Sequence, residues 1–82
     1  MQGNRVIAIG DDLPLNAGEY GKHPVNSNWY CCTPNGYFGN LSNHEVTEHE
    51  DGTITVSPSI LVSDEDGELW HGYLEHGIWR KV

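Results

Sequence analysis

Residues 53–63 read Thr53-Ile54-Thr55-Val56-Ser57-Pro58-Ser59-Ile60-Leu61-Val62-Ser63. The even positions hold Ile, Val, Pro, Ile and Val, whereas the odd positions are polar except for Leu61. This period of two predicts a half-buried β-strand. Because Pro58 has no backbone N–H to donate to a neighbouring strand, we expect the strand to bend or change partners there, as at the corner of a barrel.

Residue pairs typical of turns lie on both sides of this strand, at Asp51-Gly52 and Asp66-Gly67. A third such pair, His76-Gly77, follows farther along the chain. A two-residue loop at the first turn would set Val46 against Ser57, whereas a three-residue loop with glycine in the left-handed conformation pairs apolar residues. We predict three-residue loops at the first two turns and a two-residue loop at the third. The predicted opposite pairs are Val46–Val56, Thr47–Thr55, Ile60–Gly72, Val62–Trp70, Leu74–Trp79 and Tyr73–Arg80.

All three turns then place one set of apolar side chains on a single core face, and this agreement predicts a four-stranded antiparallel meander over residues 43–82. The core set is Val46, Ile54, Val56, Ile60, Val62, Trp70, Leu74 and Trp79. In the N-terminal half the pattern is weaker. There, Arg5–Ile9 and Asn28–Cys32 resemble short strands, Tyr37–Leu41 is a possible further one, and residues 10–27 are expected to form an irregular loop.

The predicted fold is therefore all-β, a single small domain over residues 1–82 with no helix longer than about two turns. We expect about five to seven strands, arranged as a twisted sheet or a partly closed barrel. A chain of this length buries only about 60% of its unfolded surface, so each core aromatic matters.

Acidic residues dominate the charge: twelve carboxylates against four Lys and Arg give a formal net charge of −8. Between His23 and Trp79 there is no Lys or Arg, and nine carboxylates fall in that span. Direct binding to nucleic acid or to an anionic membrane needs clustered cations, so neither is expected. The N-terminal apolar run is too short for a signal sequence or a membrane span, and a cytoplasmic location is the expectation.

The only cysteines, Cys31 and Cys32, are adjacent and cannot join distant segments through a disulfide. On a strand their side chains point to opposite faces, so both can hardly bind one metal, and we expect one core cysteine and one at the surface or between sheets. A disulfide between the two is the alternative. A zinc site is a further alternative, and it would centre on Cys31, His44 and His71.

The second face of the meander carries Leu61, Leu69, His71, Tyr73, Arg80 and Val82 by alternation. A catalytic His71 would need a nucleophile and an oriented carboxylate. Glu68 and Glu75 flank it, but no serine nucleophile signature such as Gly-x-Ser-x-Gly is present. The acidic turn beside this face lacks the spacing of a calcium loop, so its Asp-Gly pair is interpreted as turn chemistry. We expect no catalytic residues, no enzyme activity and no cofactor.

The stretches Trp29–Gly36, Pro58–Ile60 and Trp70–Arg80 resemble a group of small proteins of unknown function from bacteriophages and prophages. They also resemble, more distantly, a bacterial domain family of unknown function with a cysteine knuckle, a Pro-Ser-Ile strand and a closing Trp-His-Gly…Gly-x-Trp hairpin. Here the knuckle is reduced to Cys31-Cys32. The resemblance implies a fold and a phage or prophage context, and it implies no activity.

The expected function is that of a small acidic, non-enzymatic accessory protein that acts by contact with a protein partner or with itself. One alternative is an acidic mimic of nucleic acid that inhibits a host protein. The zinc-binding β domain is the other alternative. The residues expected to form the interaction surface are those of the second face and its adjoining turn: Leu61, Leu69, His71, Tyr73, Arg80, Asp64, Glu65, Asp66 and Glu68. We expect this apolar face to be covered, either by Arg5–Ile9 and Asn28–Cys32 or by another chain.

Overall fold

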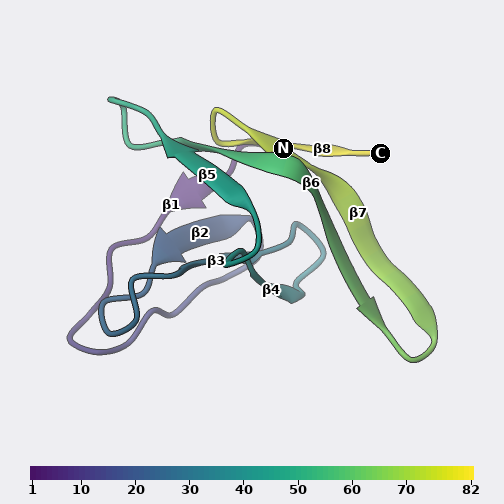
Figure 1. Ribbon diagram of the computed structural model, residues 1–82, viewed down its shortest axis with the longest axis horizontal. Helices are drawn as coiled ribbons and strands as arrows, with labels where there is room; N and C mark the ends of the chain where they lie inside the picture. Colours follow the sequence, from purple (N-terminus) through teal and green to yellow (C-terminus); the bar gives the residue numbers. More distant parts are fainter.

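A computed structural model describes all 82 residues and contains eight strands in two four-stranded sheets, with no helix (Figure 1). The N-terminal sheet has the order β1-β2-β3-β4 and the C-terminal sheet the order β5-β6-β7-β8. Their bounds are β1 Asn4–Arg5, β2 Glu19–Lys22, β3 Trp29–Cys32, β4 Phe38–Asn40, β5 Glu45–Glu48, β6 Ile54–Asp64, β7 Gly67–Glu75 and β8 Ile78–Lys81. The predicted all-β class is confirmed; the sheets do not close into a barrel.

The C-terminal sheet is the predicted antiparallel meander, in the predicted register. Val46 lies opposite Val56, Val62 opposite Trp70 and Leu74 opposite Trp79. The remaining predicted pairs, Thr47–Thr55, Ile60–Gly72 and Tyr73–Arg80, are also present. Alternation along the strands therefore placed each side chain on the correct face.

Two of the three turns have the predicted form. The β5–β6 loop has three residues, since His49 N–H donates to Thr53 O at 2.8 Å, and Gly52 has a φ of 88°. The β7–β8 loop has two residues, His76 and Gly77, with φ values of 48° and 74°. Both conformations are left-handed, as this tight turn requires.

The predicted three-residue β6–β7 loop is wrong. Asp64 pairs with Gly67, so the loop contains only Glu65 and Asp66. Within the loop, the Asp66 N–H donates to Asp64 Oδ1 at 2.9 Å. A register shift between Val62 and Ser63 absorbs the extra residue as a bulge, and this is why Val62 still faces Trp70.

β6 breaks its pairing with β7 at Pro58, as the sequence predicted. Val56 pairs with Leu74 and Ile60 with Gly72, so Ser57, Pro58 and Ser59 oppose Tyr73 alone. The pairing of β5 with β6 also ends at Ser57. The Ser57–Pro58 peptide bond is cis, and Figure 1 shows β6 bending near its middle.

The N-terminal sheet departs from prediction at two places. The predicted strand Arg5–Ile9 exists only at Asn4–Arg5, which pairs parallel with β2; farther on, Ile7 and Ile9 are exposed. The segment 10–27, predicted to be an irregular loop, contains the central strand β2. β2 shows no alternating pattern because its second buried residue is Gly21, on the face opposite Tyr20, where a Cβ would lie 2.6 Å from Val6 O.

The core lies between the two sheets and contains side chains of both, which makes one hydrophobic cluster. Trp70 and Trp79 meet edge to face there, with ring centroids 5.9 Å apart, and Trp79 Nε1–H donates to Gly18 O at 2.9 Å. The cluster is Tyr20, Cys31, Leu41, Ile54, Val56, Ile60, Trp70, Leu74 and Trp79, with Trp29, Val46 and Val62 packed against it. At its edge Arg5 pairs with Glu48 and lies 5.1 Å over the Trp29 ring.

Candidate functional site

The second face of the C-terminal sheet is open to solvent at Leu61 and Tyr73, whereas Leu69 and His71 on it are half-buried. The N-terminal sheet packs on the core face instead, through Tyr20, Cys31 and Leu41. As a result Leu61 is 55% exposed and Tyr73 39% exposed. The expectation that Arg5–Ile9 and Asn28–Cys32 cover this face is therefore wrong, because the tryptophan side of the sheet has more apolar surface to bury.

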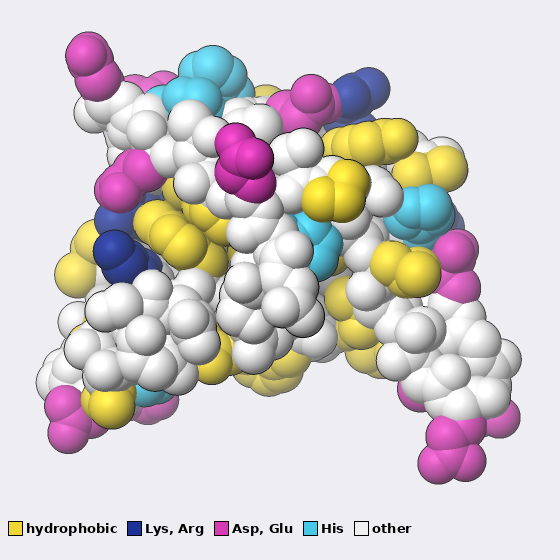
Figure 2. Space-filling view, in the orientation of Figure 1, with side chains coloured by type: hydrophobic (Ala, Val, Ile, Leu, Met, Phe, Trp, Pro, Cys, Tyr) yellow, Lys and Arg dark blue, Asp and Glu magenta, His cyan; other side chains and the backbone are white.

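The surface is chemically divided. Figure 2 shows hydrophobic side chains next to a histidine over the β6–β7 end of the molecule, while acidic side chains gather mainly at its corners. Figure 1 places the β5–β6 and β6–β7 turns, which hold most of these acids, at opposite ends of the sheet. The second face thus lies between acidic turns.

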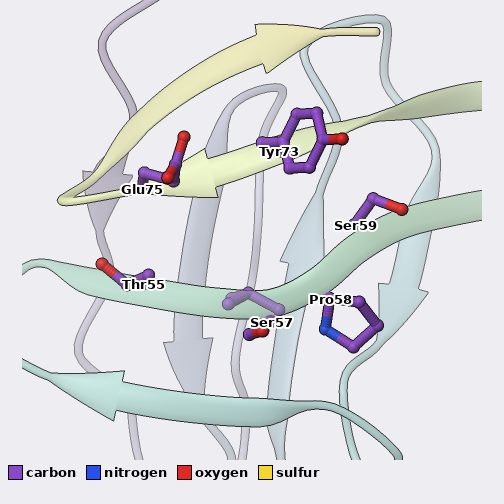
Figure 3. A pocket seen from close by; sticks show the side chains of 7 residues that line it. Thr55, Ser57, Pro58, Ser59, Tyr73 and Glu75 are labelled. Carbon is purple, nitrogen blue, oxygen red and sulfur yellow. The ribbon is translucent and has the colours of Figure 1, made fainter.

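A groove of about 310 Å³ opens on the second face where β6 separates from β7. Its walls are Thr55, Val56, Ser57, Pro58 and Ser59 of β6 with Tyr73 and Glu75 of β7. Figure 3 shows the Tyr73 ring and the Ser59 side chain on either side of the gap between the two strands. The groove therefore combines one aromatic ring, several hydroxyl groups and one carboxylate.

Arg80, the one cation expected on this face, is already paired. Its guanidinium bonds to Glu75, and its Cζ lies 5.3 Å from the centre of the Tyr73 ring. Arg80 thus holds the tyrosine ring against β8 through a cation–π contact. Its charge is compensated locally, so the turn residues Asp64–Glu68 leave the face with an acidic character.

His71 has a partner that sequence reasoning missed. Its Nε2 lies 3.0 Å from Ser59 Oγ, and its Nδ1 lies 3.6 Å from Glu68 Oε1. The predicted register already made Ser59 the diagonal neighbour of His71, since Leu61 lies directly opposite His71. This diagonal relation is the feature of the sequence from which the Ser59–His71 contact could have been predicted. A search for a linear serine motif does not detect this serine, because Ser59 and His71 lie on different strands.

The residues of the zinc alternative do not converge. His44 Nε2–H donates to Ser59 O at 3.1 Å, and His71 bonds to Ser59 Oγ. Cys31 is instead buried in the core, where a Cβ on Gly39 would lie 3.0 Å from its Sγ. No group of three His, Cys, Asp or Glu side chains is placed to hold a metal ion.

Both cysteines are buried and their thiols are free, so neither lies at the surface, which was one of the two places expected for the second cysteine. Burial raises the pKa of Cys31 to about 12, with the neighbouring Cys32 as a lesser cause. The pKa of Cys32 is also raised, first by burial and then by the charge of Glu19. Cys32 is covered because the chain before β2 binds β3: Gly18 N–H donates to Cys32 O at 2.9 Å.

The acidic turns use their carboxylates to hold the backbone. Asp51 Oδ1 accepts from Thr53 Oγ1–H at 2.6 Å and from Thr53 N–H at 3.0 Å. These two bonds lower the pKa of Asp51, with smaller contributions from His76 and His49, whose rings stack 3.7 Å apart beside it. Asp51 thus serves the structure of its own turn, and in the β6–β7 turn the carboxylate that accepts from the backbone is that of Asp64.

The Asp51 bonds predict a pH-dependent contribution to stability. Because the folded pKa lies below the unfolded value of about 3.9, the contribution is present above that pH and is lost as the pH falls through the folded pKa. Urea unfolding at a series of pH values should show Asp51→Ala less stable than the unsubstituted protein at pH 6, with a difference that shrinks at lower pH. A difference independent of pH would contradict a role for the ionised carboxylate.

No helix is both long and apolar enough to cross a membrane. Comparison with family models, with curated proteins and with solved structures gives no match for this chain. The phage context and the cytoplasmic location therefore stay predictions. The function has to be argued from the second face and its groove.

Proposed function

We propose that this protein is an interaction module that docks a partner protein on its second face. The observation that carries the proposal is the exposure of Leu61 and Tyr73 on the side of the sheet away from the core. Large apolar side chains exposed on one face of a small domain cost solubility unless something binds them. Covering them would contribute about 25 cal/mol per Å² of apolar area removed from water.

The charge around this face favours a partner segment that is both basic and apolar. Four carboxylates lie in or beside the β6–β7 turn, Asp64, Glu65, Asp66 and Glu68. Arg80 is held by Glu75, so no free cation opposes them on this face. A second copy of this chain would bring the same acids against them, so we propose a different protein as the partner.

The nucleic-acid mimic is supported less well by the same geometry. A mimic of a phosphate backbone needs carboxylates in a row, whereas these acids gather at separate corners (Figure 2). Asp51 and Asp64 are moreover occupied in bonds within their own turns. Displacement of a docked peptide by DNA would therefore contradict the docking proposal.

The test uses two short capped peptides that differ only in charge, Lys-Leu-Lys-Leu-Lys and Glu-Leu-Glu-Leu-Glu, titrated into labelled protein and followed by NMR. We expect the basic peptide alone to shift the amide signals of Leu61, His71 and Tyr73. Added salt should weaken the charge contribution, and the apolar contacts should retain part of the binding.

The double substitution Leu61→Ser with Tyr73→Ser should abolish these shifts while the protein stays folded. Val25→Ser is the control, because Val25 is also an exposed apolar residue, at 68%, but lies in the loop before β3. Shifts confined to the β5–β6 turn, displacement by DNA, or self-association that the double substitution removes would each contradict docking of a basic partner.

A further inference from the structure

We infer that Ser59 is a nucleophilic serine, activated by His71, that accepts an acyl group from a small activated ester bound in the groove. This inference goes beyond docking and rests on different atoms. It depends on the Ser59, His71 and Glu68 side chains, whereas docking depends on the apolar area of Leu61 and Tyr73.

The hydrogen-bonding geometry gives His71 the role of a base. Ser59 Oγ lies 3.0 Å from His71 Nε2, and Glu68 Oε1 lies 3.6 Å from Nδ1 on the opposite side of the ring. A carboxylate beside Nδ1 favours the tautomer with its proton on Nδ1. The lone pair of Nε2 then faces the serine, so the Ser59 hydroxyl donates its proton toward His71. Serine nucleophiles on unrelated folds are activated by a hydroxyl, an imidazole and a carboxylate in this order. In this protein the carboxylate contact, at 3.6 Å, is an electrostatic contact longer than a hydrogen bond.

The break in β6 presents Ser59 to the groove. Ser57, Pro58 and Ser59 oppose Tyr73 alone, so the strands separate there, and Ser59 lines the groove between them (Figure 3). His44 fixes the backbone from the other side by donating Nε2–H to Ser59 O at 3.1 Å. Ser57 lines the same groove, but no imidazole bonds to it. The geometry therefore distinguishes one serine from its neighbour.

The size, the aromatic ring and the charge of the groove together favour one class of ester. Its volume of about 310 Å³ suits a small molecule, and the Tyr73 ring offers a surface for a planar leaving group. Glu75, which lines the groove, disfavours an anionic ester, so the expected substrates are uncharged or cationic.

In the reaction, Ser59 Oγ attacks the carbonyl carbon of the ester while its proton passes to His71 Nε2. The tetrahedral intermediate then collapses: the bond from carbon to the leaving-group oxygen breaks, and that oxygen takes the proton from Nε2. The products are acyl-Ser59 and a free alcohol or phenol. If water repeats the attack with the same base, the products are a carboxylic acid and the original serine.

The experiment incubates the intact protein with p-nitrophenyl acetate, follows release of nitrophenol, and maps acetyl groups by mass spectrometry. We expect one acetyl group on Ser59 and none on Ser57, appearing with a burst of nitrophenol. Ser59→Ala should remove both signals. His71→Gln, which keeps a polar side chain without the base, should slow acetylation by about 100-fold. Glu68→Gln should slow it less, because it acts by positioning the ring.

Ser63→Ala is the matched control, since Ser63 is an exposed serine of β6 outside the groove. It should react like the unsubstituted protein, and circular dichroism should show every variant folded. Acetylation only at amines, equal acetylation of Ser57 and Ser59, or an unchanged rate in folded His71→Gln would overturn the inference. Since the Leu61 and Tyr73 test measures peptide binding, failure of one proposal is distinguishable from failure of the other.

Discussion

Replacing Leu74 with alanine should lower the free energy of unfolding by about 2–5 kcal/mol, a large share of the stability of a domain this small. Leu74 is 0% exposed and lies opposite both Val56 and Trp79, at the centre of the C-terminal sheet. Its removal leaves a cavity between the two sheets that the tryptophans cannot fill without leaving their edge-to-face contact. Chemical denaturation followed by tryptophan fluorescence measures the loss directly.

The adjacent residue provides the control. Tyr73→Ser alters the next side chain on the same strand, but that side chain points to the second face and is 39% exposed. We expect a loss of less than about 1 kcal/mol, typical of surface positions. If Tyr73→Ser costs as much as Leu74→Ala, the second face is part of a core and the docking proposal has no free surface to use.

The C-terminal half was predictable because two independent patterns agree there. Alternation assigns the face of each residue in residues 53–63, and the glycine-containing turns assign the register. The wrong loop length at the β6–β7 turn did not change the predicted register at Val62, because the bulge after Val62 compensates for the shorter loop. Burial of Trp70 opposite Val62 is a stronger constraint than the form of an exposed turn.

The N-terminal half was less predictable because its strands are short and one of them is marked by glycine. β2 buries Tyr20 beside Gly21, and glycine contributes nothing to an alternation signal. What Gly21 does contribute is close approach of the Val6 backbone, a property of three-dimensional packing. The prolines and glycines of segment 10–27 therefore predict a loop at a place where the structure has a strand.

The residues that form the second face could be predicted from the sequence, but the segments that pack against each face of the sheet could not. The members of the second face followed from alternation, but which face the N-terminal sheet covers depends on how two sheets pack, and strand periodicity carries no such information. The Ser59–His71 pair differs, because the predicted register of β6 and β7 already makes the two residues diagonal neighbours. It joins residues twelve positions apart across a strand break, so no linear motif describes it.

The thiol of Cys31 should react at least about 1,000-fold more slowly with a thiol reagent in the folded protein than in the unfolded chain. Only the thiolate reacts, and a pKa of about 12 in place of 9.0 lowers the thiolate fraction at pH 8 from about one in ten to about one in ten thousand. Because the folded pKa is raised, the associated stability is present below pH 9 and declines as the pH rises toward 12.

The measurement is the rate of reaction with Ellman's reagent at pH 8, in buffer and in denaturant. Cys32→Ser isolates Cys31, and Cys31→Ser isolates Cys32, whose pKa is also raised by burial. Both variants should react slowly until the protein unfolds. Fast reaction of either thiol in the folded variants would show that Cys31-Cys32 is chemically active. So would protection of the unsubstituted protein that is lost on reduction, because it would reveal a disulfide between the two. Slow reaction of both leaves Ser59 as the candidate nucleophile of this chain.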